Sequence, residues 1–345
     1  MSADERHVNQ SQSLSSLGLE FRDQALESAV AGTLGQVEDV LRETVASANP
    51  LITEMARHLV DAGGKRFRPM LVALTAQFGQ ADHPGVVKAG AVVELTHLAT
   101  LYHDDVMDEA AVRRGAVSAN SRWGNSLAIL VGDYLFARAA NLTAELGVEA
   151  VRLQARTFAR LVHGQVAETA GPAAGEDPIE HYLEVIAQKT GSLIATSARF
   201  GAIFGGLPAD QVESLTYYGE TIGAAFQLSD DLLDIASDAA QSGKTPGTDL
   251  REGVPTLPVL YALASPESDS AASRLRDILG AGPVTDDQLH AEALGLLRES
   301  PALKRARMTV RTYAERAQES LSGLPAVPAR RALESVCEAL VDRTV

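Results

Sequence analysis

Apolar side chains recur at every third or fourth position along most of this chain. Between residues 21 and 48 they stand at Leu26, Val30, Leu34, Val37, Val40, Leu41 and Val45. This spacing is typical of an amphipathic helix. The same pattern, interrupted by glycine and proline, predicts further helices over residues 51–61, 65–78, 86–109, 125–146, 149–169, 178–204, 208–236, 256–264, 270–279, 286–298, 301–321 and 329–341.

The pattern predicts an all-α fold, because no stretch of useful length alternates apolar and polar residues as a half-buried strand does. We expect about a dozen helices in a single bundle. Residues 1–18 are polar and rich in serine and glutamine, which predicts a disordered N-terminal lead. No later linker is long enough to divide domains, so residues 19–345 are expected to form one domain.

Two clusters of aspartates lie near the ends of two apolar helices. In the first, Asp104 and Asp108 are one helical turn apart, with Asp105 beside them. A shift of 126 residues leads to a second copy, made of Asp230, Asp231 and Asp234. Carboxylates this close repel one another unless a cation neutralises them, and a set of oxygen ligands suits Mg²⁺. The clusters therefore predict magnesium ions that are shared with substrate phosphates.

The alternative interpretation is that both clusters are solvated helix ends. One cluster alone would favour that interpretation, but two clusters, each ending an apolar helix and each followed by a basic loop, oppose it. Two such helices would face each other across one apolar cavity with carboxylates at its rim. A cavity of this kind fits a hydrophobic substrate that carries a diphosphate.

Several cations lie where an anion would be bound. Lys65, Arg66 and Arg68 follow a glycine pair at the start of a predicted helix, where backbone amides and positive charge favour phosphate. Lys189 precedes a threonine inside a later helix, and Lys244 lies in a glycine- and proline-rich loop that resembles a mobile flap. Taken singly, the basic run and Lys189 are better explained as solvated surface residues, and the loop that carries Lys244 could equally be a connector.

Composition excludes several classes of protein. A net charge of −15 opposes nucleic-acid binding, which needs basic patches. The single cysteine, Cys337, excludes an internal disulfide and a cysteine-based metal site. No apolar run reaches the roughly 18 residues of a membrane-spanning helix, and the N-terminus lacks a signal-peptide pattern. We expect a soluble, cytoplasmic protein that associates with a membrane only loosely, for product release.

Taken together and in this order, the motifs resemble those of the trans-polyprenyl diphosphate synthases over residues 21–345. They are Gly-Gly-Lys-Arg-x-Arg-Pro at 63–69, the aspartates at 104–108, Arg-Arg-Gly at 113–115, Lys-Thr at 189–190, Phe-Gln at 226–227 with the aspartates at 230–234, and Gly-Lys at 243–244 with Gly-x-Asp-Leu at 247–250. The resemblance implies an all-α bundle around a central apolar cavity, several Mg²⁺ ions per active site and a homodimer.

The resemblance also assigns roles to individual residues. The Mg²⁺ ions on the allylic diphosphate would be bound by Asp104, Asp108 and Asp230, with Asp105 nearby. The allylic diphosphate itself would be bound by Arg113, Lys189, Thr190, Gln227 and Lys244. The diphosphate of isopentenyl diphosphate would be bound by Lys65, Arg68, His97 and Arg114. Catalysis would depend on the aspartates together with Arg113, Lys189 and Lys244.

The implied reaction is a prenyl transfer. The allylic C–O bond breaks, the isopentenyl double bond attacks the resulting carbocation, and a proton is lost. Ala99 and Thr100, just before the first aspartates, are small, as in synthases that make long side chains of respiratory quinones. We therefore expect a hexa- to decaprenyl product, although Tyr102 stands where leucine is more usual and leaves the exact length open.

Three alternatives compete with a long-chain synthase. A farnesyl or geranylgeranyl diphosphate synthase would share every motif and differ only in product length. A terpene cyclase would need a single diphosphate site, whereas this chain has two aspartate clusters and a second set of cations. A non-catalytic partner subunit is expected to have lost some motif residues, and none is lost here.

Overall fold

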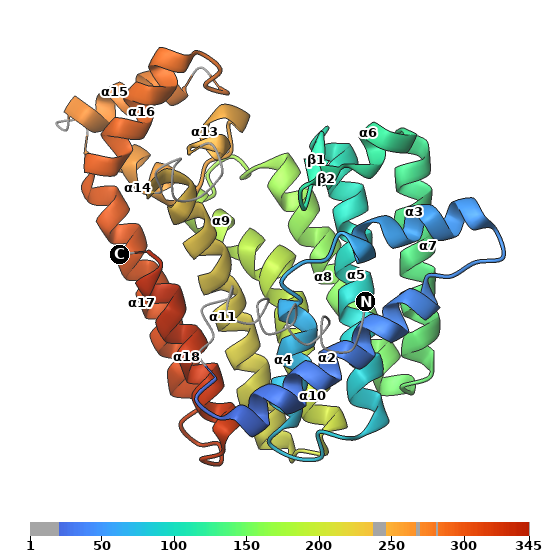
Figure 1. Cartoon of the computed structure of the whole chain (residues 1–345). Coiled ribbons are helices and arrows are strands. Elements are labelled where there is room, and N and C mark those ends of the chain that lie inside the picture. The colour runs from blue at the N-terminus through green and yellow to red at the C-terminus, as the bar shows by residue number, and fades with distance from the viewer. Residues whose placement is uncertain (1–20, 237–245, 267–269, 281, 345) are drawn as a thin grey trace. The chain divides into compact units, whose positions relative to one another are not determined.

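The computed structural model describes residues 21–236, 246–266, 270–280 and 282–344 (Figure 1). Its fold is all-α, as the apolar pattern predicts. The N-terminal lead expected for residues 1–18 lies outside the described residues. The chain divides into two compact units. Unit 1 takes in the described residues up to Ala159, with Leu193–Gly219 and Ser320–Val336, and unit 2 takes in Arg160–Ser192, Glu220–Glu319 and Cys337–Val345. The single-domain expectation for residues 19–345 stays a prediction.

Unit 1 is built around one buried helix, α5 (Pro84–Met107). Its neighbours in the first part of the chain are α2 (Gln24–Thr44), α3 (Pro50–Asp61), α4 (Phe67–Ala76), α6 (Ala119–Trp123) and α7 (Asn125–Ala144). Helix α5 packs against α2, α4, α6 and α7, so most of its circumference is covered (Figure 1). A helix that is covered on several sides is expected to be apolar around most of its circumference, as α5 is. Its few polar residues are therefore confined to particular positions.

A short hairpin follows α5 and was not predicted. Strand β1 (Val112–Arg113) pairs antiparallel with β2 (Ala116–Val117), with Val112 opposite Val117. The turn residues Arg114 and Gly115 both have positive φ, 53° and 76°, as tight hairpins require. Two-residue strands are too short to show an alternating pattern in the sequence. The hairpin brings two arginines back towards the C-terminal end of α5.

Unit 2 is assembled mostly from shorter helices. They are α9 (Pro178–Ile186), η1 (Ala187–Gly191), α13 (Thr248–Glu252), α14 (Leu257–Leu263), α15 (Ser270–Leu279), α16 (Asp287–Glu299) and most of α17 (Pro301–Ser320). Four further helices have residues in both units, namely α8 (Val148–Ala170), α10 (Ser192–Phe204), α11 (Ala209–Ala236) and α18 (Pro328–Asp342). The unit 2 core includes Leu228, Leu232, Tyr261 and Leu297.

One predicted long helix is interrupted. The sequence predicts a helix over 178–204, but the structure has α9, then one π-helical turn at η1, and then α10. Gly164 of α8 lies against this turn, because a Cβ at that position would stand 2.6 Å from the Lys189 nitrogen. Single π-helical turns are rare and are frequently found at functional sites. Lys189 and Thr190 lie inside it.

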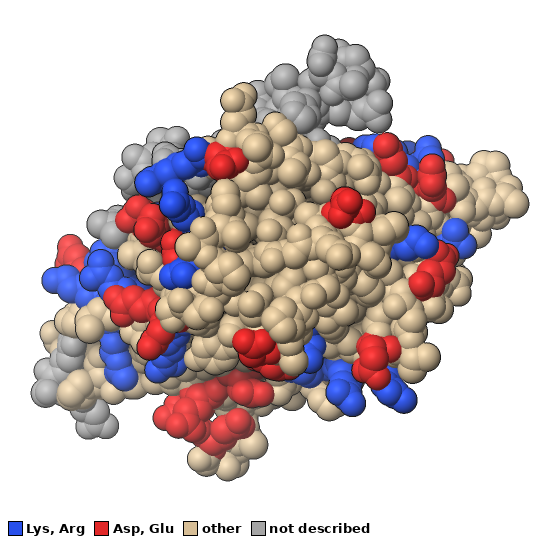
Figure 2. Space-filling model, turned by 90° about the horizontal axis from the view of Figure 1, so that it is seen from below, with Lys and Arg blue, Asp and Glu red and all other residues tan. Residues whose placement is uncertain are grey.

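Charged side chains of both signs lie next to one another on the face shown in Figure 2. Within the described part of the chain, α7 is the one helix that is long and apolar enough to cross a membrane by length and composition. That helix packs against α5, and core helices of this kind pass the same test.

We predict that Gly201→Ala destabilises the fold. Gly201 of α10 lies so close to α4 that an added methyl group would overlap the Thr75 hydroxyl and the Val72 carbonyl. Overpacking of this kind costs about 1–3 kcal/mol. Gly32 of α2 is exposed and has no atom near its missing Cβ, so Gly32→Ala should instead stabilise by about 0.5–1 kcal/mol. Denaturant unfolding of both variants measures the contrast, and equal free energies of unfolding would contradict it.

Candidate active site

The first aspartate cluster closes the C-terminal end of α5. Asp108 is the C-cap residue, and its backbone N–H donates to the Asp104 carbonyl. Asp108 is exposed and Asp104 is half-buried, one turn apart as predicted. Asp105 differs from both, because its side chain is fully buried. The three carboxylates therefore have different environments although they are adjacent in sequence.

Asp105 is held by the hairpin. The Arg113 Nε donates to Asp105 Oδ1 at 2.5 Å. Burial raises the pKa of Asp105, and the hydrogen bond and charge of Arg113 act against that rise. The other oxygen, Oδ2, is buried with no hydrogen-bond partner among the described residues. An unpartnered buried carboxylate oxygen leaves a place for a further positive group.

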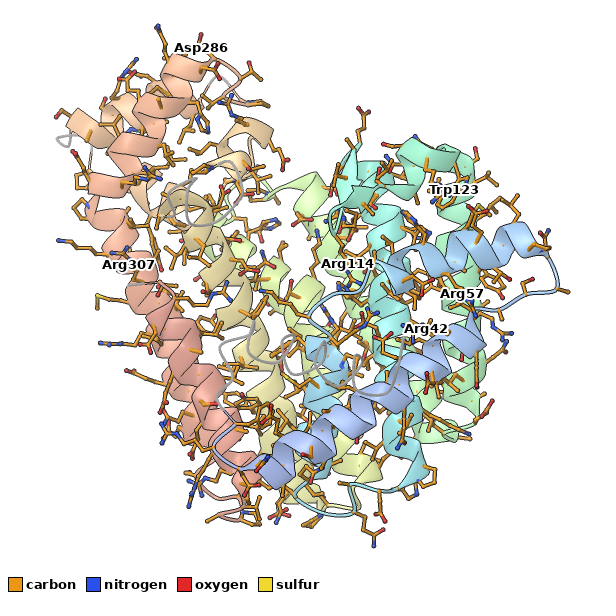
Figure 3. The ribbon with its side chains drawn as sticks, viewed as in Figure 1. Arg42, Arg57, Arg114, Trp123, Asp286 and Arg307 are labelled. Carbon is orange, nitrogen blue, oxygen red and sulfur yellow. The ribbon has the colours of Figure 1, made fainter. Side chains whose placement is uncertain are left out.

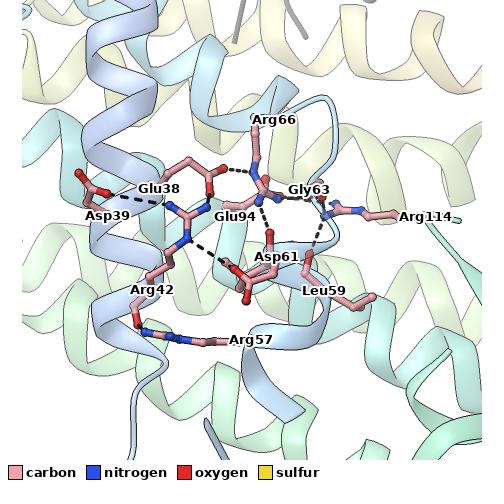
Figure 4. A network of polar contacts seen from close by, with 11 residues as sticks. Glu38, Asp39, Arg42, Arg57, Leu59, Asp61, Gly63, Arg66, Glu94 and Arg114 are labelled. Atoms are coloured by element: carbon pink, nitrogen blue, oxygen red, sulfur yellow. Dashed lines mark hydrogen bonds and ion pairs between the residues drawn. The ribbon is translucent and has the colours of Figure 1, made fainter. Parts of the chain in front are cut away.

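The basic segment between α3 and α4 is tied to α5 and α2 (Figure 4). The Arg66 guanidinium donates from Nε to Glu38 at 2.5 Å and from Nη1 to Glu94 at 2.7 Å. Glu94, on α5, is 1% exposed. Arg66 also donates from Nη1 to the Gly63 carbonyl at 3.2 Å and from Nη2 to the Val60 carbonyl at 2.8 Å. This arginine is therefore fully engaged inside the protein.

Arg114, labelled in Figures 3 and 4, joins the same network from the hairpin. Its Nη1 donates to the Gly63 carbonyl and, at 3.3 Å, to the Leu59 carbonyl. Its Nη2 lies 3.5 Å from Glu94 Oε1. Gly64 packs under the guanidinium, because an added Cβ would stand 2.8 Å from Arg114 Cζ. The glycine pair is required here for close approach as well as for positive φ.

Lys65, Arg68 and His97 complete the cation-rich part of unit 1. Lys65 is exposed, whereas Arg68 and His97 are half-buried. Burial lowers the pKa of Arg68 to about 10, with Glu94 opposing the shift. Burial, together with the charges of Arg68 and Arg114, lowers the pKa of His97 well below its usual value. His97 is therefore a neutral hydrogen-bonding group near neutral pH, and Arg68 remains a cation.

The two residues expected to control chain length lie in the C-terminal part of α5, just before the first aspartates. Ala99 is fully buried, and its carbonyl is 3.2 Å from where a Cβ on Gly132 of α7 would stand. Thr100 is half-buried and donates its hydroxyl to the His97 carbonyl at 2.8 Å. Tyr102 is buried and points to α3, where it donates to the Met55 carbonyl at 2.5 Å. Tyr102 is thus a packing residue that joins α5 to α3.

The second cluster lies near the end of α11, in unit 2. Asp230 is exposed and forms an ion pair with Arg343, the residue just after α18, whose guanidinium also lies over the Phe226 ring at 5.3 Å. Asp231 is buried and accepts hydrogen bonds from the Tyr182 hydroxyl and, at 2.9 Å, from Gln227 Nε2. Burial raises the pKa of Asp231 to about 6, against the effect of these two donors.

Asp234 has a structural partner. Its two carboxylate oxygens accept from the backbone N–H groups of Thr248 and Asp249, each at 3.1 Å. These are the first residues of α13, whose N–H groups have no partner within the helix. The carboxylate therefore caps α13 from outside and attaches it to α11.

The other predicted residues of unit 2 that the structure describes are Lys189 and Thr190 of η1 and Gln227 of α11. Lys189 pairs with Glu168 of α8, and the Thr190 hydroxyl donates to Gln227 Oε1 at 3.3 Å. Gln227 thus links Thr190 to the buried Asp231. Lys244 lies outside the described residues. The expectation that the two aspartate clusters face one another concerns the placement of unit 1 relative to unit 2, and it stays a prediction.

The two copies of the aspartate motif share a pattern that the sequence alone did not reveal. In each copy the middle aspartate, Asp105 or Asp231, is buried and hydrogen-bonded, and the first is more accessible. The residues that hold the middle carboxylates come from outside the motif, as Arg113 and Tyr182 do. Tyr182, Arg343 and the structural role of Arg66 were not predicted from the sequence, and no role was predicted for Glu94.

Comparison with known proteins identifies the family of the chain. Residues 49–296 match the family model of polyprenyl synthetase. A nonaprenyl diphosphate synthase of Mycobacterium tuberculosis is 51% identical over 95% of this chain and 96% of its own length. A geranylgeranyl pyrophosphate synthase from Corynebacterium glutamicum, solved with calcium and isoprenyl diphosphate, superposes with a TM-score of 0.85, 44% identity and coverage of 94% and 99%.

A decaprenyl diphosphate synthase from Rhodobacter capsulatus is also similar, with a TM-score of 0.84, 36% identity and coverage of 93% of this chain and 99% of that one. The family match spans more than half of the chain, and the relatives are matched over nearly their whole length. The chain belongs to the polyprenyl synthetase family, as a trans-polyprenyl diphosphate synthase of the long-chain type.

Proposed function

We propose that the chain condenses isopentenyl diphosphate with an allylic diphosphate, head-to-tail and in trans, to give a hexa- to decaprenyl diphosphate for a quinone side chain. The observation that carries the proposal is that unit 1 holds two separate polar groups. One is the accessible aspartate pair Asp104 and Asp108, and the other is the arginine cluster around Glu94. Two polar groups suit the binding of two diphosphates, whereas a terpene cyclase needs to bind only one diphosphate.

We propose Mg²⁺ as the metal. Among the described residues no three aspartate, glutamate, histidine or cysteine side chains form a ready-made metal group. This fits Mg²⁺, which keeps several waters and uses one or two carboxylates together with substrate phosphates. Asp104, Asp108 and Asp230 would hold the ions, and bound Mg²⁺ would stabilise the charge on the departing diphosphate. A relative crystallised with calcium and isoprenyl diphosphate supports a divalent ion in such a site.

Side chains of this protein would bind the two diphosphates. Arg113, Lys189, Thr190, Gln227 and Lys244 would bind the allylic diphosphate. Lys65, Arg68, Arg114 and a neutral His97 would bind the isopentenyl diphosphate. Cations placed in advance lower the barrier because charge accumulates on the leaving diphosphate in the transition state. The apolar surroundings of α5 would keep water from the carbocation.

We predict that the purified chain alone makes a polyprenyl diphosphate from these two substrates with Mg²⁺, and that excess EDTA abolishes the activity. Asp104→Ala should lower kcat by about a hundredfold or more, because it removes a metal ligand from the departing charge. Asp287, an exposed aspartate of α16, provides the control, and Asp287→Ala should retain normal activity. Full turnover in EDTA would contradict the metal requirement, and a need for a second protein would contradict the proposed function.

The product length rests on Ala99 and Thr100. Side chains on a helix lean towards its N-terminus, so residues one turn before Asp104 lie where a growing tail leaves the diphosphate. Thr100 is half-buried and shares the face of Asp104, whereas Ala99 is already packed. The nonaprenyl and decaprenyl synthase relatives support a long product. The geranylgeranyl synthase relative corresponds to the short-chain alternative.

We predict that Thr100→Phe or Ala99→Phe keeps the reaction and shortens the product, since a ring fills the space that the tail would occupy. Each isoprene unit that can no longer be buried contains several methylene-sized groups, and each group loses about 0.8 kcal/mol of burial free energy. Thr100→Val keeps the size of the side chain and should leave the length unchanged. Product chromatography decides this, and an unchanged long product from both phenylalanine variants would show that the tail runs elsewhere.

We also propose a homodimer. Helix α7 exposes Ile129 and Leu130, and the nearby part of α8 exposes Val148, Val151 and Phe158. Several large apolar side chains on adjacent helices are typical of an interaction surface. We propose a second copy of the same chain as the partner, because the proposed reaction requires no other protein. From the sequence, we also propose a cytoplasmic location and a loose membrane association for product release.

We predict that Leu130→Glu converts the dimer to a monomer, because a charge placed in an apolar interface is left unpaired. Met308 of α17 is 68% exposed, so Met308→Glu is the matched control and should leave the dimer intact. Sedimentation velocity measures both. A monomeric wild-type protein, or a dimer that tolerates Leu130→Glu, would contradict this surface.

A further inference from the structure

Glu94 is a buried carboxylate that none of the proposed steps uses. It lies within α5, ten residues before Asp104, and is 1% exposed. Burial alone would raise its pKa, but the positive charges of Arg66, Arg114 and Arg68 outweigh burial and lower it. Glu94 is therefore ionised on an otherwise apolar helix. A buried charge is maintained only where opposite charges and hydrogen bonds compensate it.

The compensating groups are Arg66 and the two arginines of the proposed isopentenyl diphosphate site, Arg68 and Arg114. Arg66 donates to Glu94 at 2.7 Å, and Arg114 Nη2 lies 3.5 Å from the same oxygen. Arg68 is close enough for Glu94 to influence its pKa, and its Nε is buried without a hydrogen-bond partner among the described residues. Arg66 and Arg114 thus contact Glu94, Arg66 also contacts Glu38, and Arg68 lies nearby. The cluster keeps an excess of positive charge.

The backbone around the cluster is held in conformations that need support. Arg66 and Arg114 have left-handed backbones, with φ of 48° and 53°, which non-glycine residues rarely adopt. Both side chains donate to one acceptor, the Gly63 carbonyl, and both meet Glu94. The loop before α4 and the hairpin after α5 are therefore joined to each other through Glu94 and Gly63 (Figure 4).

We propose that Glu94 is a positioning residue, the shared counter-ion that sets the Lys65–Arg68 segment through Arg66 and orients Arg114 directly, so that these cations are in place for the isopentenyl diphosphate. This inference rests on the proposed function. Without the carboxylate, like charges at this distance repel, and the guanidinium groups move apart. Arg66, whose donors are all used internally, does not bind the substrate itself.

The test is Glu94→Gln, which keeps the shape and removes the charge. With each substrate varied in turn, KM for isopentenyl diphosphate should rise about tenfold or more, while KM for the allylic substrate changes less than about twofold. Glu220 is the matched control, because it aligns with Glu94 in the second copy and pairs with an arginine, Arg160. Glu220→Gln should leave KM for isopentenyl diphosphate unchanged.

A comparison with Glu38→Gln distinguishes a positioning role of Glu94 from a purely structural one. Glu38→Gln removes the ion pairs of Glu38 with Arg66 and Arg42 without touching Arg114, so it should lower the melting temperature while raising KM for isopentenyl diphosphate less than Glu94→Gln does. Equal effects of the two variants on that KM, or equal rises in both KM values, would overturn the proposal. If Glu94→Gln does not fold, Arg66→Lys applies the same test, because lysine cannot reach both carboxylates and both carbonyls.

Binding separates this inference from the reaction itself. Calorimetric titration of inorganic pyrophosphate needs no turnover. Weaker binding to Glu94→Gln than to Glu220→Gln would support the positioning role even if the wild-type chain made no polyprenyl product, in which case the proposed function alone would fail. Equal binding to the two variants, in a wild type that turns over, would overturn the positioning role alone.

Discussion

The burial of carboxyl groups on apolar helices is the constraint on which this molecule depends. An unpaired charge in such a place costs several kcal/mol, so each one needs its own donor. Asp105 has Arg113, Glu94 has Arg66, and Asp231 has Tyr182 and Gln227. In unit 1 the donors come from the loop before α4 and from the hairpin after α5. Because the donors must reach inwards, these two irregular segments adopt defined conformations instead of moving freely.

This pairing divides the work within each aspartate motif. The middle carboxylate, Asp105 or Asp231, is turned inwards and hydrogen-bonded, so it fixes the helix end in place. The first, Asp104 or Asp230, is more accessible, and Asp108 is exposed as well. Asp234 differs from Asp108, because it caps α13. In the proposed function the accessible aspartates would supply part of a metal coordination shell, and the substrate diphosphates would supply the remainder.

The sequence predicted the long helices well, because a sustained apolar period is a direct consequence of one buried face. It did not predict the hairpin at 112–117 or the π-helical turn at 187–191, since both are shorter than any period that could reveal them. Charged residues were harder to interpret. The basic run at 65–68 was expected to face an anion, yet Arg66 turns inwards to Glu38 and Glu94, which depends on residues 28 positions away on either side.

We propose that protein and diphosphate together build the metal site. Titration calorimetry of Mg²⁺ into the purified chain, with and without saturating inorganic pyrophosphate, tests it most directly once the heat of Mg²⁺ binding to pyrophosphate alone is subtracted. The account predicts weak metal binding to the protein alone and an affinity at least about tenfold higher when pyrophosphate is present. Tight, stoichiometric Mg²⁺ binding of equal affinity with and without pyrophosphate would contradict it.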